Sequence, residues 1–331
     1  GAAWGGVWLW LAVLYMAILT VLIDQLVPMT AGAADGDAFP AADALLLGVG
    51  LGALILLPVS VCAIAGPGAL PGLDRVLLFV ATGFWLGQVA HPAAHELIHR
   101  SRRSLFQLGV AVYTSLLFGH HASAHRLVHH RHVASPADPN SARSGEGFYR
   151  FALRAWPGSF RAGYQAESDL RARAGKAGLH PYALYLGGAG LALALAYALA
   201  GWAGVLVWAG LAAHAQSQIL LSDYVQHYGL TRASRADGRL VPVGPEHSWN
   251  TAHWFTAAVM LNAPRHSDHH MHPARPYPAL RLPAPDQAPR LPWPLPLACT
   301  LALFPGLWRR LIRPHLSRWR KAAQEMQDTP P

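Results

Sequence analysis

The fold of this chain is decided by an apolar segment that ends in two histidines. Residues 76–99 read VLLFVATGFWLGQVAHPAAHELIH. A helix that crosses a membrane needs about 20 mostly apolar residues, and the residues up to position 94 supply that length. His95 and His99 follow with a spacing of four, which stacks their imidazoles on one face of a helix. This segment therefore predicts a membrane-spanning helix with a pair of potential metal ligands at its end.

Four more segments are long and apolar enough to span a membrane. The composition agrees, because 53% of the 331 residues are hydrophobic and only 13% are charged, which is unusual for a soluble domain. No repeat or second globular domain is visible, so we expect residues 1–331 to form a single domain. The prediction is an all-α integral membrane protein with a bundle of about five transmembrane helices, at residues 7–27, 42–64, 76–94, 182–200 and 204–225.

Two further apolar segments are borderline and are not expected to span. Residues 105–121 lie between the first histidine pair and a second histidine cluster that begins at His125. If both clusters bind one metal centre, the chain must return to the same side of the membrane between them, so this segment lies in the interface or dips and returns. Residues 291–307 are interrupted by four prolines and are expected to be interfacial or re-entrant.

Lys and Arg are concentrated in a few segments, and the formal net charge is +9 at pH 7. Beside long apolar runs, basic clusters are typical of the cytoplasmic face of a membrane protein rather than of nucleic-acid binding. We therefore expect a helical cytoplasmic cap made of residues 95–181 and 226–331. With that orientation, five spans place the N-terminus outside, and the chain begins at Gly1 rather than at Met. We expect one more span before it, which gives six in the intact protein.

Nine of the 19 histidines fall into four clusters. A single pair of histidines four residues apart is more often a solvated helix face or a hydrogen-bonded pair than a metal site. Three clusters and one further histidine, all placed by topology at one membrane face, instead indicate a metal centre. Thiolates are not expected to take part, because the two cysteines form no CxxC motif. The clusters are His95 and His99; His125, His129 and His130; His227; and His266, His269 and His270.

The number of clustered imidazoles implies two metal ions, because a single zinc prefers four ligands. Imidazole suits iron, copper, nickel and zinc alike, so the ligand type narrows the metal without fixing it. A redox-inactive pair would support hydrolysis. A site at a membrane face that is reached through apolar helices is better suited to a hydrocarbon without a hydrolysable bond, which favours iron and O2 chemistry.

Three carboxylates lie within the clusters, namely Glu96, Asp223 and Asp268. A carboxylate beside a metal-binding histidine can accept the other ring N–H and so fix the tautomer and orientation of the ring. Ordinary surface solvation explains the same residues equally well. Asp138, which is followed by Pro139 and Asn140, can take the same role beside a histidine or cap a turn, and the turn is the more typical of the two.

These motifs resemble those of the membrane-bound di-iron alkane monooxygenases, or alkane hydroxylases, which are related to xylene monooxygenase and to the fatty acid desaturase superfamily. The likeness extends in order from about residue 23 to residue 312. DYVQHYGL at 223–230 and RHSDHH at 265–270 are specific to the hydroxylases rather than the desaturases. The other matching motifs are HELIHR at 95–100, the second histidine cluster with the segment that follows it to residue 139, and PEHSWN at 245–250.

The resemblance implies O2-dependent hydroxylation of a hydrocarbon C–H bond at a non-haem di-iron centre, with the terminal methyl of an alkane or alkyl chain as the expected target. The substrate would enter from the bilayer of a bacterial cytoplasmic (inner) membrane, with the active site on the cytoplasmic face. Electrons would come from a rubredoxin or ferredoxin with its reductase, since the chain has no cysteine motif for an iron–sulfur cluster of its own. The ligands of the two Fe ions would be His95, His99, His125, His129, His130, His227, His266, His269 and His270.

Three residues depart from the usual family pattern. Ala124 and Gln226 stand where Glu is usual, and Ile98 matches the xylene-type form of the first motif, since the alkane enzymes more often have Gly there. An aromatic-methyl (xylene-type) hydroxylase or a fatty acyl desaturase is therefore an alternative outcome at the same centre.

A metal transporter is an alternative of another class. It predicts ionisable residues near the bilayer midplane, whereas every histidine cluster here lies at a helix end. For an enzyme, we expect the substrate to thread between the spanning helices, past residues that are equally typical of helix packing. Those residues are Trp85, Leu86, Leu220 and Leu221.

Overall fold

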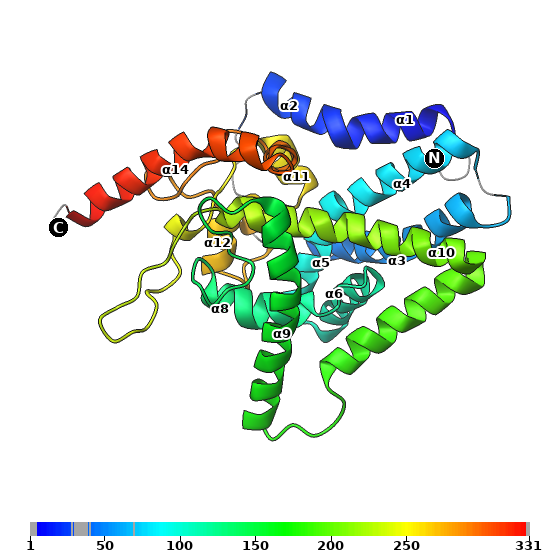
Figure 1. Cartoon of the computed structure of the whole chain (residues 1–331), viewed down its shortest axis with the longest axis horizontal. Helices are drawn as coiled ribbons and strands as arrows, with labels where there is room; N and C mark the ends of the chain where they lie inside the picture. The colour runs from blue at the N-terminus through cyan, green and yellow to red at the C-terminus, as the bar shows by residue number, and fades with distance from the viewer. Residues whose placement is uncertain (1–4, 28, 30–38, 40, 69, 329–331) are drawn as a thin grey trace.

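The computed structural model describes residues 5–27, 29, 39, 41–68 and 70–328, with side chains up to residue 322 (Figure 1). The opening Gly1 lies outside these residues. Within the described residues the chain forms helices and loops, with two isolated β-bridges and no strand, so the predicted all-α architecture is confirmed. The helices are α1 (Val7–Leu14), η1 (Tyr15–Leu19), α2 (Thr20–Leu26), α3 (Ala42–Ala65), α4 (Gly72–Trp85), η3 (Leu86–Ala90), α5 (His91–Ile98), α6 (Arg103–Ser115), α7 (His121–Ala124), η4 (His125–His129), α8 (His130–His132), α9 (Phe148–Arg173), α10 (Pro181–His227), η5 (Pro245–His247), α11 (Trp254–Val259), α12 (His266–Met271), η6 (Tyr277–Ala279), α13 (Leu295–Ala302) and α14 (Pro305–Asp328). Of these, η1, η3 and η4 are π-helical turns, and η5 and η6 are 3-10 turns.

Four helical stretches are long and apolar enough to cross a membrane. They are Val7–Leu26, Ala42–Ala65, Gly72–Ile98 and Pro181–His227. The first three coincide with the predicted segments 7–27, 42–64 and 76–94. Two of the four, Gly72–Ile98 and Pro181–His227, end at clustered histidines.

The fourth stretch, α10, contains a reversal of chain direction. Its backbone leaves the helical conformation at Ala200 (φ −153°, ψ 27°) and at Gly201 (φ 58°, ψ −150°). Glycine adopts a positive φ at little cost, so Gly201 allows the chain to turn back. Figure 1 shows the two arms of α10 as a hairpin, and the arms correspond to the predicted segments 182–200 and 204–225.

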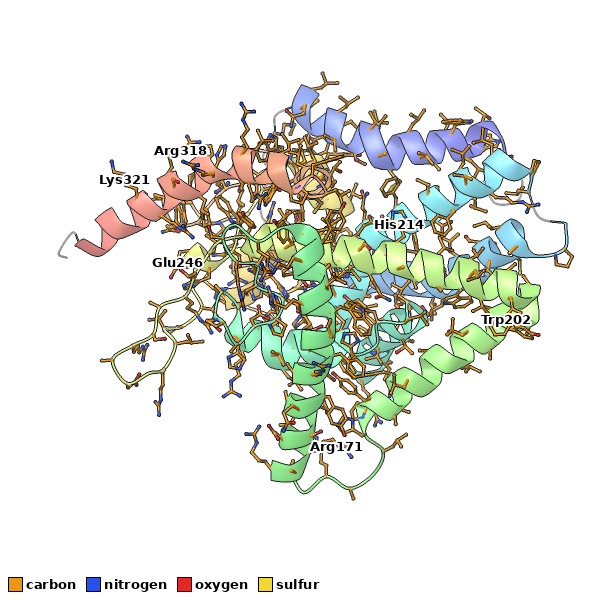
Figure 2. The ribbon with its side chains drawn as sticks, viewed as in Figure 1. Arg171, Trp202, His214, Glu246, Arg318 and Lys321 are labelled. Carbon is orange, nitrogen blue, oxygen red and sulfur yellow. The ribbon has the colours of Figure 1, made fainter. Side chains whose placement is uncertain are left out.

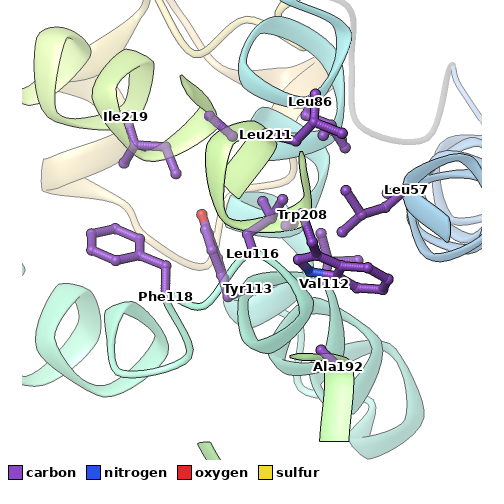
Figure 3. Close-up of a cluster of buried hydrophobic side chains, with 14 of the residues drawn as sticks. Leu57, Leu86, Val112, Tyr113, Leu116, Phe118, Ala192, Trp208, Leu211 and Ile219 are labelled. Carbon is purple, nitrogen blue, oxygen red and sulfur yellow. The ribbon is translucent and has the colours of Figure 1, made fainter. Parts of the chain in front are cut away.

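The inner faces of the long helices meet in a buried apolar core, part of which is drawn in Figure 3. Trp208 of α10 packs there against the core that includes Leu57 of α3, Leu86 of η3 and Val112 of α6. The outer faces carry large exposed apolar side chains. Trp202, which lies at the hairpin of α10 in Figure 2, is 73% exposed. An exterior of this kind suits lipid contact rather than water.

Helix α6 begins close to the histidine-bearing end of α5. It has 13 residues, too few to span. It packs closely on α5 through Gly109, where an added Cβ would lie 2.9 Å from the backbone oxygen of Ala94. Residues 105–121 are not among the stretches long and apolar enough to cross a membrane, which agrees with the prediction that they do not span. In the second borderline segment, α13 has only eight residues and no spanning helix is found.

Candidate metal centre

The structure brings the nine clustered histidines together in two groups. Each histidine offers one ring nitrogen, and within a group these atoms all lie within 4.8 Å of one another. The groups come from four separate parts of the chain: the end of α5, η4 with α8, the end of α10, and α12. The first group is His95, His99, His125, His130 and His269, and the second is His129, His227, His266 and His270.

The spacing of the ring nitrogens suits shared metal ions. In the first group, Nε2 of His125 lies 2.7 Å from Nε2 of His95 and 2.9 Å from Nε2 of His130. In the second, Nε2 of His266 lies 3.0 Å from Nε2 of both His227 and His270. Two nitrogens that are each about 2.1 Å from one metal, at right angles, would be about 3 Å apart.

Adjacent residues divide between the two groups. His130 belongs to the first and His129 to the second, and on α12 His269 belongs to the first and His270 to the second. The rings of His130 and His270 are 4.6 Å apart between centroids, although they belong to different groups. The two candidate metal positions are therefore neighbours, as a two-metal centre requires.

Burial favours the form of imidazole that binds metals. It lowers the pKa of His125, His130, His269 and His270 well below the ordinary value, so these rings are neutral at pH 7. Metal binding requires a deprotonated ring nitrogen. Nε2 of both His99 and His129 is buried and has no hydrogen-bond partner in the described part of the chain. Buried polar atoms are rarely left unpaired, so the donor set fits a pair of imidazole-bound metal ions.

One carboxylate holds a clustered histidine directly, and it is Asp138. Its Oδ2 lies 2.8 Å from Nδ1 of His129. Asp138 also accepts hydrogen bonds from the backbone N–H of Asn140 and the hydroxyl of Ser141, so it caps the turn as well. Burial alone would lower the pKa of His129, but the negative charge and hydrogen bond of Asp138 outweigh it and raise that pKa. Asp138 therefore has both of the roles that the sequence allowed, although the turn cap alone had been favoured.

The sequence predicted that Glu96, Asp223 and Asp268 would accept a ring N–H from a metal-binding histidine, but these three carboxylates have other partners. Oδ2 of Asp223 accepts a hydrogen bond from Asn140, and it therefore supports the turn that carries Asp138. Glu96 accepts the backbone N–H of Tyr277. Asp268 is paired with Arg275. No hydrogen bond from these three to a clustered histidine is found among the described residues.

Two supporting contacts were not foreseen from the sequence. The backbone oxygen of His247 lies 3.3 Å from Nδ1 of His227 and can orient that ring. The side chain of Asn250 bonds to both the hydroxyl and the backbone N–H of Ser267, which follows His266 at the start of α12. His247 and Asn250 both lie in the PEHSWN motif at 245–250. The motif therefore indicated this region, but it did not indicate which groups these two residues contact.

The unusual residues Ala124 and Gln226 are explained by packing. A Cβ added to Gly163 of α9 would lie 2.9 Å from the Cβ of Ala124, which leaves no room at position 124 for a longer side chain on that face. Gln226 donates from Nε2 to the backbone oxygen of Ala263 at 3.1 Å and accepts from Ser222 at 2.8 Å. A glutamate could not donate the first of these bonds.

A cavity of about 460 Å³ lies between η1, η3, α10 and α13. At one end it is lined by His91, whose ring lies 6.1 Å from that of His95 and whose Nδ1 is 2.9 Å from the hydroxyl of Tyr113. Of the residues expected beside the substrate, Leu221 lines this cavity. Leu86 and Leu220 are instead buried in apolar cores, and Trp85 packs against one.

Comparison with known proteins identifies relatives of this chain. A model of the fatty acid desaturase family matches residues 73–300. Alkane 1-monooxygenase 1 of Pseudomonas aeruginosa is 33% identical over an alignment of 264 positions, which covers 78% of this chain and 67% of the relative. Alkane 1-monooxygenase of Pseudomonas putida is 32% identical over an alignment of 275 positions, which covers 77% of this chain and 63% of the relative. The chain thus spans about two thirds of the length of these relatives.

A relative with a different name matches more of the chain at lower identity. The xylene/toluene monooxygenase hydroxylase component of Pseudomonas putida is 27% identical over an alignment of 343 positions, which covers 96% of this chain and 85% of the relative.

Proposed function

This chain belongs to the fatty acid desaturase family, and on that basis we propose that it uses O2 to hydroxylate the terminal methyl of an alkane or alkyl chain at a non-haem di-iron centre. The observation that supports this most strongly is the pair of neighbouring histidine groups. An all-imidazole donor set of this size suits two irons. The mostly apolar cavity that ends at His91 gives a hydrocarbon a route to them.

The nine histidines would each contribute one nitrogen, five to one iron and four to the other. When bound, the irons would supply the activation of O2 and the cleavage of the C–H bond. The protein holds the ligand rings in place before metal binds, through the bond from His129 to Asp138 and the contact of His227 with the His247 carbonyl. Burial of the groups keeps water from the reacting atoms.

We propose Asp138 as the principal carboxylate of the centre. Asp223 supports it through Asn140, while Glu96 and Asp268 brace α5 and α12, the helices that carry His95 and His270. These carboxylates would act on the irons only through the positions of the histidines.

The topology that we propose has five membrane-spanning segments, with the two arms of α10 counted separately, and a cytoplasmic cap at residues 95–181 and 226–331. Both Gly72–Ile98 and α10 end at the histidine groups, which is consistent with a centre on one membrane face. The exposed arginines of α14 favour the cytoplasmic face of a bacterial inner membrane.

The electron donor that we propose is a rubredoxin or ferredoxin, reduced by its own reductase. Such carriers are usually acidic, and α14 presents a basic surface to them. A surface groove is lined by Arg309, Arg310, Arg313 and Arg320, and a neighbouring one by Arg290 and Arg318. Charge complementarity of this kind mainly accelerates association and depends on ionic strength.

An aromatic-methyl hydroxylase is the second candidate function. The xylene/toluene monooxygenase component favours it, because its alignment covers almost the whole chain. Ile98, which first suggested this alternative, is buried in the apolar core, and it is not among the residues that line the cavity.

Oxidation under 18O2 tests the reaction and separates the two candidates. Iron-loaded protein in nanodiscs, with reduced rubredoxin and its reductase, would be given equimolar octane and p-xylene. The proposal predicts 1-octanol with one labelled oxygen as the main product. Labelled 4-methylbenzyl alcohol as the main product would favour the second candidate, and octenes without label would contradict hydroxylation.

A further inference from the structure

The cavity beside the histidine groups has an unusual lining for a pocket that holds a hydrocarbon. Most of the lining is apolar, but it also includes the side chains of Gln88, His214 and Gln218, and none of the described residues that line it is Lys, Arg, Asp or Glu. Figure 2 places His214 between α10 and the helices that face it. Uncompensated polar groups are costly inside a membrane-spanning bundle, and where they occur they commonly mark functional sites.

These three side chains have hydrogen-bonding capacity that the described part of the protein leaves unused. Nε2 of Gln218 donates to the backbone oxygen of Gly83 at 2.8 Å, and this contact fixes the orientation of the amide because a carbonyl can only accept. Its Oε1 has no partner among the described residues. The same is true of the buried Nδ1 of His214 and of the amide of Gln88, which is 8% exposed.

The backbone opposite α10 is shaped to admit these groups. A Cβ added to Gly83 would lie 1.7 Å from Nδ1 of His214, and one added to Gly87 would lie 2.3 Å from the side-chain amide of Gln218. Gly87 and Gln88 belong to η3, and η1 also contributes to the lining. Single π-helical turns within α-helices are frequent at functional sites.

The polar side chains lie at a distance from the histidine groups. Gly87 and Gly83 precede His95 by eight and twelve residues. At 1.5 Å per residue, Gln218 and His214 therefore lie about 12 and about 18 Å from His95 along the helix. An extended chain whose methyl end reaches His95 would have its other end beside these side chains.

We propose that this cavity selects an alkyl chain with a neutral hydrogen-bonding group, a hydroxyl or an amide, far from the methyl that is oxidised. Such a group can donate to Oε1 of Gln218 and accept from the amide of Gln88 or from Nε2 of His214, since Nδ1 of His214 is buried against Gly83. A carboxylate is not expected, because the described lining of the cavity contains no Lys or Arg to pair with it. This inference rests on the proposed function and names its substrate class.

A competition between tridecane and 1-dodecanol tests the selection, because the two differ only in the replacement of one methyl by a hydroxyl. Iron-loaded protein in nanodiscs would receive both at equal concentration, and the ratio of 1,12-dodecanediol to 1-tridecanol would be measured. We expect the wild type to favour the diol. Gln88→Leu and His214→Phe should each shift the ratio toward the alkane product by about two- to tenfold.

The ratio is independent of how much of each variant is folded, since both substrates meet the same molecules. Ser217→Ala is the matched control: Ser217 also lines the cavity, but its hydroxyl already donates to the backbone oxygen of Ala213. Its ratio should equal that of the wild type. The same ratio in all four proteins, or a preference of the wild type for tridecane, would overturn the inference while leaving hydroxylation intact.

Failure of the proposed function would look different, because neither substrate would be oxidised. In that case a binding measurement, without any turnover, tests the inference. If it is correct, 1-dodecanol raises the midpoint of thermal unfolding of the wild type more than tridecane does, and Gln88→Leu removes that difference. An equal effect of the two compounds on the wild type would overturn it, as expected if only water occupies the polar part of the cavity.

Discussion

Asp138 and His129 are joined by a hydrogen bond of 2.8 Å between Oδ2 and Nδ1, with both side chains buried. The contact directs the opposite ring nitrogen of His129 toward the second histidine group, where it has no other partner in the described part of the chain. A carboxylate in this position fixes the tautomer of a metal ligand and raises its basicity.

Asp138→Asn should weaken metal binding at the second group. The amide keeps the shape of the side chain but loses its charge, so we expect iron affinity to fall by about 10- to 100-fold. Iron retained after dialysis against graded chelator concentrations measures this. Asp237→Asn is the control, because Asp237 is exposed and pairs only with Arg239 in the described structure. Equal retention in both variants would show that Asp138 matters for the turn alone.

Acid should destabilise the metal-free protein. Burial lowers the pKa of His125, His130, His269 and His270 well below 6.5. Below about pH 6.5 the unfolded chain therefore binds protons that the folded chain does not, and the free energy of unfolding falls. Each such histidine contributes about 1.4 kcal/mol per pH unit. The raised pKa of His129 acts in the opposite sense only above about pH 6.5, because below that pH His129 is protonated in both the folded and the unfolded chain.

The midpoint of thermal unfolding between about pH 7.5 and about pH 5.5 checks this expectation. For the metal-free protein it should fall as the pH drops below about 6.5. A midpoint that stays constant or rises would mean that the rings are not buried as described.

Gln226→Glu should destabilise the fold, although it restores the residue usual in related enzymes. Glutamate cannot donate to the carbonyl of Ala263, so a buried acceptor loses its partner. We expect a loss of about 1–3 kcal/mol in the free energy of unfolding. Chemical unfolding in detergent measures it, with Gln107→Glu on the exposed face of α6 as control. Equal stability of the two variants would refute the packing explanation for Gln226.

Reversing charge on α14 should impair delivery of electrons without affecting the metal centre. In Arg310→Glu with Arg313→Glu, we expect the KM for the acidic donor to rise by about tenfold at low salt, with little change in kcat. The difference should shrink as salt is added, since exposed charges are screened. Arg173→Glu should leave the KM unchanged. Arg173 lies at the end of α9, two residues after Arg171, and Figure 2 shows Arg171 far from Arg318 of α14. A KM that is insensitive to the α14 charges would place the donor elsewhere.

Hydropathy and histidine spacing predicted much of this architecture. The apolar segments match the long helices, and the reversal at Gly201 falls where a short turn was expected between two of them. The prediction that residues 105–121 return without spanning followed from chemistry, since His95 and His125 had to reach one centre. Their Nε2 atoms lie 2.7 Å apart.

The remaining features depend on contacts that no sequence period records. The division of His129 and His130, and of His269 and His270, between two groups depends on how the helices that carry them pack together, which no sequence signature indicates. The support from Asp138 crosses a turn nine residues long, so no helical spacing indicated it. Gln88 and Gln218 are polar residues within apolar segments, and only their shared cavity gives them a common role.

The metal content of purified protein tests the central proposal most directly. Inductively coupled plasma analysis should find about two irons per chain in the wild type. His269→Ala and His270→Ala remove one ligand from different groups, so each variant should lose about one iron, while His315→Ala on α14 should keep both. Zinc in place of iron after growth with ample iron, or full iron retention in both ligand variants, would contradict a di-iron centre at these histidines.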